Sequence, residues 1–249
     1  MNINTKLDEE FSHQQFRQGH DAGRMETEYM TLARCFAAVE NGIAVLSNLN
    51  GRVSHIYYGA MGEFLGIAGR GTHHRIESIW EEEILSHVHP DDLIAKQLQE
   101  LKFFQYAKKD CSGDPSGYSL ESCLRMADAS GTYHAVTHRI FYCNTNDRDI
   151  WLALCLYSFG TEGKGDAIIR NNTNGEVIRL TENDYTAILS NRETSVLRLI
   201  EQGKSSKEIA GMLSISVNTV NRHRQNILEK LHAGNSIEAC RTAKELRII

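Results

Sequence analysis

Four side chains near the C-terminus have the types and spacing needed to read DNA bases. Asn218, Asn221, Arg222 and Gln225 follow the spacing i, i+3, i+4, i+7, which places them on one side of a helix. Arginine can hydrogen-bond to guanine O6 and N7, and asparagine and glutamine can do the same to adenine N6 and N7. None of the four side chains is a carboxylate. A solvated polar surface is the alternative interpretation, but four amide or guanidinium groups together favour base recognition.

Further polar side chains lie around this face. We expect four of them to lie near the phosphates of the DNA backbone: Lys204, Thr219, Arg224 and Lys230. Such contacts would position the protein on a duplex without reading its sequence.

The helix that carries these side chains is predicted over Val217 to Leu231. Val220, Ile227 and Leu231 form its apolar stripe, and Ser216 is a suitable N-cap. A tight turn, Ser214 to Ser216, comes before it.

Two more helices are predicted upstream. Asn191 to Gln202 ends at Gly203, a typical C-terminal stop. Ser205 and Glu208 have capping-box spacing at the start of the next helix, whose small Ala210 allows a close crossing. Two helices joined by a tight turn form a helix-turn-helix, whose second helix enters the major groove.

The distribution of charge agrees with this assignment. Ser190 to Ile249 hold 10 basic and 6 acidic residues of the chain's 27 and 32, which leaves 17 basic and 26 acidic residues elsewhere. A basic tail on an acidic body is typical of a nucleic-acid module fused to a domain that does not bind nucleic acid.

The run from Leu189 to Leu231 resembles the LuxR-type (GerE- or NarL-like) DNA-binding domain almost position by position. The resemblance rests on Gly203-Lys204-Ser205-Ser206-Lys207-Glu208-Ile209-Ala210 and Ser216-Val217-Asn218-Thr219-Val220-Asn221-Arg222-His223. It implies base contacts from Asn221, Arg222 and Gln225 and phosphate contacts that include Thr219 and Lys230. It further implies that double-stranded DNA is the partner, that a last helix over Ser236 to Leu246 dimerises the protein, and that RNA polymerase is a candidate partner. The side chains expected in the dimer seam are Ile237, Ala239, Cys240 and Ala243.

The N-terminal part has a strand-rich pattern. After one or two helices between Leu7 and Val39, strands are predicted over Ile43 to Leu49 and Arg52 to Tyr58, joined by a type I′ turn at Asn50-Gly51. A short helix is predicted over Ala60 to Ile67. Glu77 to Tyr106 has a mostly helical pattern, which is interrupted at Val88 to Asp92, where an aspartate can cap the next helix. Three more strands are predicted, over Ser119 to Ala127, Tyr133 to Cys143 and Ile150 to Phe159.

This order predicts a five-stranded antiparallel sheet with helices on one face, and it resembles the PAS fold. The resemblance is carried by Val88-His89-Pro90-Asp91-Asp92, a turn that many PAS domains have before the helix leading to the third strand. It implies a sensory or dimerising module, which could hold an unidentified small molecule between sheet and helices. The cysteine motif of flavin-binding light sensors is absent.

The expected fold class is therefore α+β, with an all-α C-terminal domain of four helices. The expected divisions are a helical segment over 1–31, a PAS-like domain over 32–160, a linker over 161–184 with a small hairpin at Asn174-Gly175, and the helix-turn-helix domain over 185–249.

Other functions receive less support from the sequence. The scattered cysteines and the histidines 73, 74, 87 and 89 indicate neither a disulfide framework nor a metal site, and no catalytic constellation or cofactor motif stands out. The start of the chain lacks a signal-peptide pattern and no run is long enough to cross a membrane, so a cytoplasmic address is expected. The alternatives are a phosphorylated response regulator, a sensor of acyl-homoserine lactones, and an enzyme with a regulatory tail.

Overall fold

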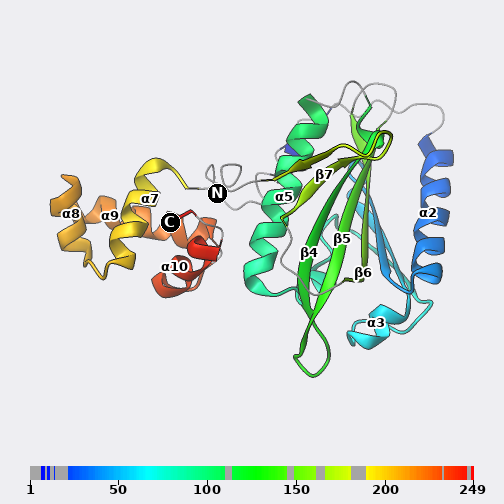
Figure 1. Ribbon diagram of the computed structural model, residues 1–249, viewed down its shortest axis with the longest axis horizontal. Helices are drawn as coiled ribbons and strands as arrows, with labels where there is room; N and C mark the ends of the chain where they lie inside the picture. Colours follow the sequence, from blue (N-terminus) through cyan, green and yellow to red (C-terminus); the bar gives the residue numbers. More distant parts are fainter. Residues whose placement is uncertain are drawn as a thin grey trace. The chain divides into compact units, whose positions relative to one another are not determined.

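The computed structural model describes residues 7–8, 10–11, 14, 22–109, 114–144, 149–160, 166–180, 189–231, 233–245 and 248–249. The chain forms two compact units, Glu10–Leu180 and Thr181–Ile249 with Met1–Glu9. The first is built on a sheet, and the second is helical in its described part (Figure 1).

The sheet has eight strands in the order β3-β2-β1-β6-β5-β4-β7-β8, and all of its pairings are antiparallel. The prediction of five strands was therefore too low, although those five lie side by side in the middle. An antiparallel sheet also excludes the parallel α/β receiver that the response-regulator alternative needs. The strands are β1 (Ile43–Asn48), β2 (Val53–Tyr58), β3 (His73–Ile76), β4 (Tyr118–Ala127), β5 (Tyr133–Asn144), β6 (Ile150–Phe159), β7 (Ile168–Asn171) and β8 (Val177–Arg179).

Helices cover both faces of the sheet, where one face was expected. Helix α2 (Ala22–Val39) packs Ala33 and Ala37 against β1 and β6. Helix α5 (Pro90–Lys109) lies on the opposite side, where Phe103 stacks on Tyr142 of β5 with ring centroids 4.8 Å apart (Figure 1). Because β6 lies between these layers, its side chains are buried on both faces from Ile150 to Tyr157, which explains its continuous apolar run.

The first hairpin forms as predicted, but with a different turn. Asn48 pairs with Val53, so the loop has four residues rather than two. The positive φ lies at Arg52 (51°), and not at the two central residues that a type I′ turn requires. The Asn48 side chain accepts a hydrogen bond from the Gly51 amide at 2.8 Å, which stabilises this longer loop.

The turn before α5 joins the helices to the sheet. Short helices α3 (Ala60–Phe64) and α4 (Glu82–Leu85) precede it, and Pro90 occupies the first position of α5, where its missing N–H costs nothing. The Asp92 carboxylate receives two hydrogen bonds from the Arg125 guanidinium, at 2.8 and 2.7 Å. This aspartate thus ties α5 to β4 instead of capping the helix.

Part of the expected linker belongs to the sheet. The hairpin predicted at Asn174-Gly175 exists, and Gly175 has the positive φ of 80° that favours glycine there. However, β7 pairs with β4, with Leu120 opposite Ile169. The described residues from 166 to 180 are therefore strands and turns of the sheet unit.

The helical unit contains α7 (Asn191–Glu201), α8 (Ser206–Leu213), α9 (Val217–Lys230) and α10 (Ser236–Glu245). These bounds match the predicted helices to within one residue at their described ends. Their shared core consists of fully or nearly fully buried side chains: Leu189, Val196, Leu197, Ile209, Val220, Ile227, Leu231, Ala239 and Ala243.

Candidate nucleic-acid interface

Helix α9 has one buried and one exposed side, as its pattern predicted. Val220 and Ile227 are buried on the first side, whereas Asn218, Asn221, Arg222 and Gln225 are all exposed on the second. The Gln225 amide nitrogen donates to Glu229 one turn later, at 3.0 Å. This bond orients the Gln225 side chain and leaves its carbonyl oxygen outside that contact. The face can therefore present donors and acceptors to the edges of bases.

The start of α9 is fixed by a local cap. The Ser216 side chain accepts a hydrogen bond from the Thr219 amide at 3.0 Å, which confirms Ser216 as the N-cap. The Ile215 amide donates to the Ala210 carbonyl, so the turn closes directly on α8. Ser214 takes the left-handed conformation, with φ of 53°. Three consecutive residues, Ser214 to Ser216, thus connect the two helices.

Helices α7 and α8 begin with complete capping boxes. At the start of α8, Ser205 and Glu208 exchange side-chain and backbone hydrogen bonds as predicted. At the start of α7, Ser190 and Glu193 form a second capping box, which their three-residue spacing in the sequence could have revealed. The hydrogen bonds from Ser205 lower the pKa of Glu208. Both helices therefore have defined first turns.

The four side chains predicted to contact phosphate have different surroundings. Thr219 is exposed and its hydroxyl lies 2.8 Å from that of Ser216, and Lys204 is partly exposed just before α8. Arg224 is partly buried and donates to the Ser236 hydroxyl of α10 at 3.0 Å. Lys230 donates to the Glu193 carboxylate at 2.6 Å. Arg224 and Lys230 thus also join helices within the unit.

Glu193 and Arg192 are structural residues that the sequence interpretation missed. The Glu193 side chain is only 3% exposed and joins the cap of α7 to Lys230 of α9. Burial acts to raise the pKa of Glu193, but hydrogen bonds from Lys230 and Ser190 lower it below its ordinary value. Arg192 donates to the Leu213 carbonyl at 2.5 Å, beside the turn. Adjacent residues of α7 thereby hold the end of α8 and the end of α9.

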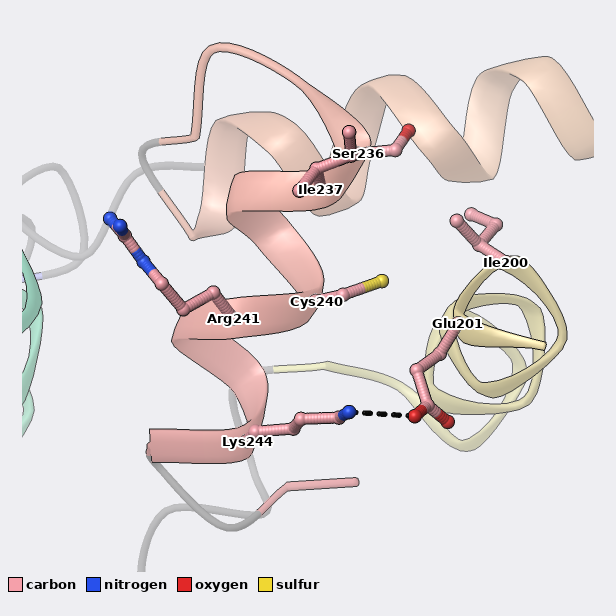
Figure 2. A pocket seen from close by; sticks show the side chains of 7 residues that line it. All are labelled: Ile200, Glu201, Ser236, Ile237, Cys240, Arg241 and Lys244. Atoms are coloured by element: carbon pink, nitrogen blue, oxygen red, sulfur yellow. Dashed lines mark ion pairs between the residues drawn. The ribbon is translucent and has the colours of Figure 1, made fainter. Parts of the chain in front are cut away.

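A groove of about 410 Å³ lies between α7 and α10 (Figure 2). Cys240 and Lys244 point from α10 toward α7, where Lys244 forms an ion pair of 2.7 Å with Glu201. Ile237 is 85% exposed. Of the side chains predicted for a dimer seam, Ala239 and Ala243 are fully buried within their own unit. The other two predicted seam side chains, Ile237 and Cys240, line this groove and are accessible.

The sheet unit contains a small cavity of about 40 Å³ between the sheet and α5. Its lining includes aromatic side chains and three buried charged ones, Glu81, Lys96 and Glu100. No group of three or more metal-ligating side chains occurs among the residues with described positions. In particular, His87 lies 2.8 Å from the Ala127 carbonyl. None of the described helices has the length and apolar character of a membrane span.

Comparison with known proteins identifies the helical unit. Residues 187–243 match the family model GerE, bacterial regulatory proteins of the luxR family. The response regulatory protein YgeK of Escherichia coli is 45% identical over 60 residues, 24% of this chain and 41% of that protein. DesR of Bacillus subtilis is 44% identical over 82 residues, which cover 31% of this chain and 41% of that protein. SdiA of Escherichia coli is 42% identical over 71 residues, which cover 28% of each protein. The chain thus spans less than half the length of these relatives, all of which are named as regulatory proteins.

Solved structures resemble the whole chain only distantly. The VqmA dimer of Vibrio cholerae is 19% identical over 89% of this chain and 88% of that one, with a TM-score of 0.29. SdiA of Escherichia coli is 16% identical over 99% and 97%, with a TM-score of 0.24. Similarity at this level establishes neither a shared ligand nor a shared assembly. The match over 187–243, together with the capped helix-turn-helix, shows that the C-terminal unit carries a regulatory domain of the luxR family.

Proposed function

We propose that this protein is a transcription regulator that binds specific DNA sequences through α9. The observation that supports this most is the coincidence of the luxR-family match with an exposed row of four hydrogen-bonding side chains. Asn218, Asn221, Arg222 and Gln225 read bases in the major groove in this proposal. Lys204, Thr219, Arg224 and Lys230 meet phosphates at its edges.

The regulator acts as a homodimer in this proposal. The α10 face with Ile237 and Cys240 is the seam, because exposed apolar side chains on a helix are suited to pack against a second copy. A two-fold dimer requires a pseudo-palindromic site. In this proposal, the DNA-bound regulator contacts RNA polymerase at the promoter. It acts in the cytoplasm.

The sheet unit is the input domain in this proposal, and it is PAS-like. Support comes from five adjacent antiparallel strands and from Asp92, which joins the turn before α5 to β4. The cavity beside α5 offers a place for a small molecule. A ligand that binds there would alter dimerisation or the availability of the helical unit for DNA.

Selection of random duplex DNA with the full-length protein tests this function. Sequencing of the retained DNA should give an enriched motif with two-fold symmetry. If neither the full chain nor residues 185–249 alone enrich any motif, the protein does not read DNA sequence and the proposal fails.

A further inference from the structure

The cavity in the sheet unit combines an apolar aromatic wall with buried charges. Phe11, Trp80 and Tyr142 line one part of it. Phe11 packs edge-on against Phe104 of α5, with ring centroids 4.9 Å apart, so it closes this side of the cavity. An aromatic wall is favourable for an organic cation, because the ring faces carry negative potential.

The charged lining contains two carboxyl side chains and one lysine. Lys96 forms ion pairs with Glu100, one turn along α5, and with Glu81, whose Oε1 lies 3.9 Å from the Lys96 nitrogen. All three side chains are less than 10% exposed. Tyr157 donates to Glu81 at 2.8 Å and adds no charge. One ammonium group therefore faces two carboxylates in a dry environment, where an uncompensated charge is costly.

Among the residues that the structure describes, the histidine beside the cluster does not add a positive charge. His138 is fully buried, and its Nε2 lies 3.9 Å from Glu100 Oε1 without a hydrogen-bond partner among the described residues. Burial lowers the pKa of His138 well below its ordinary value, so the imidazole is neutral. Burial raises the pKa of Glu100, the neighbouring Glu81 adds to this, and Lys96 acts to lower it. The pKa of Lys96 is raised by Glu100 and Glu81, although its burial acts to lower it.

We propose that this cavity binds a small organic ammonium ion, held by Glu100 and Glu81 and packed against the aromatic wall of Phe11, Trp80 and Tyr142. The inference rests on the proposed role of the sheet unit as the input domain. A metal ion would fit less well, because the described residues offer no group of three or more metal-ligating side chains and most of the other lining side chains are apolar. The ammonium ion would complete the charge balance and donate hydrogen bonds to the carboxylates.

A series of probes with the same carbon skeleton and different charge tests the proposal in the full-length protein. Isobutylamine, isobutanol and isobutyrate are titrated while the indole N–H signals are followed by NMR. The chain has two tryptophans. Trp80 lines the cavity and Trp151 is buried against α2 on the other face of the sheet, so Trp151 serves as the internal reference. Trp151→Phe assigns the two signals.

The ammonium probe should shift the Trp80 signal saturably and leave that of Trp151 unchanged, with affinity about tenfold or more above that of the alcohol and the carboxylate. Glu100→Gln should abolish the preference, because it leaves Lys96 and Glu81 as a neutral pair. Glu121→Gln is the matched control, since that side chain is on β4 and pairs with Arg170 at the surface. Equal binding of the alcohol, tighter binding of the carboxylate, no saturable shift with the amine, or unchanged amine binding in Glu100→Gln would overturn the proposal.

The wild-type series decides the question even if Glu100→Gln does not fold. Its outcome can also be distinguished from the outcome of the DNA selection. A failed amine titration beside an enriched DNA motif removes only this inference, whereas bound amine without any enriched motif removes the DNA-binding function and leaves the cavity assignment.

Discussion

At the scale of single residues, the helix-turn-helix depends on contacts that α7 makes to its neighbours. Glu193 is buried and bound by Lys230, and Arg192 is bonded to the end of α8. Lys230 was predicted from the sequence as a phosphate contact, and its ion pair gives it a second, structural role. The two roles make different predictions, since one concerns affinity and the other stability.

Lys230→Ala should lower the free energy of unfolding by about 1–3 kcal/mol, because Glu193 would lose its partner while it stays buried. The lowered pKa of Glu193 means that its contribution to stability is present above its ordinary value of 4.5 and is lost as the pH falls through the folded pKa. The difference in urea-unfolding free energy between wild type and variant should therefore shrink from pH 7 to acidic pH. A difference that stays constant with pH would contradict the role of this ion pair.

Ser214→Gly should stabilise the protein by about 0.5–1 kcal/mol. Ser214 has a φ of 53°, a conformation in which glycine avoids the steric cost that other residues carry. The matched control is Ser195→Gly in the middle of α7, which should destabilise by about 0.5–1 kcal/mol. Thermal unfolding of both variants gives the two signs, and a loss of stability in Ser214→Gly would refute the strain at this turn.

At the scale of elements, the sequence predicted strongly patterned segments well and exposed, short ones poorly. The capped helices α7 to α9 and the long strands β4 to β6 lie close to their predicted bounds. Strand β3 was missed because its residues, His73 to Ile76, show no apolar face and are exposed or half-buried. β7 has four residues and becomes a strand only by pairing with β4, a long-range contact that local pattern does not contain.

The pairing of β7 with β4 predicts unequal effects of two isoleucines in one hairpin. Ile169 is 2% exposed, whereas Ile178 on β8 is 44% exposed. Ile169→Ala should cost about 2–4 kcal/mol of stability and Ile178→Ala less than about 1 kcal/mol. Urea unfolding, with the sheet transition followed by circular dichroism, measures both. Equal small losses would mean that this hairpin is a linker, as the composition first indicated.

At the scale of the whole molecule, the C-terminal 60 residues and the rest of the chain have opposite charge balances that fit different tasks. The C-terminal residues from Ser190 carry more basic than acidic residues, and the rest of the chain carries more acidic ones. The sequence predicted the exposed face of α9 because the spacing of its residues is local. It did not reveal the buried cluster of Glu81, Lys96 and Glu100, because these residues meet only after α5 folds onto the sheet.

Lys204→Ala should weaken binding to all DNA sequences similarly. A lost phosphate contact reduces the slope of log affinity against log salt concentration by about one unit. Arg70→Ala, an exposed substitution in the sheet unit, is the control and should leave the slope unchanged. Fluorescence anisotropy on two unrelated duplexes from 50 to 200 mM salt (roughly the range where such contacts dominate) measures the slopes. Weakening confined to one of the duplexes would assign Lys204 to base reading instead.

The most direct measurement of the central claim, that the exposed face of α9 reads bases, compares the motifs that wild type and Arg222→Ala select from random duplex DNA. Arg222 is exposed and lies on the helix side opposite the buried Val220 and Ile227 stripe. The substitution should cost about 1–3 kcal/mol on the preferred site and relax the preference at one base pair of each half-site, while the other positions stay enriched. An unchanged motif at every position would contradict the claim.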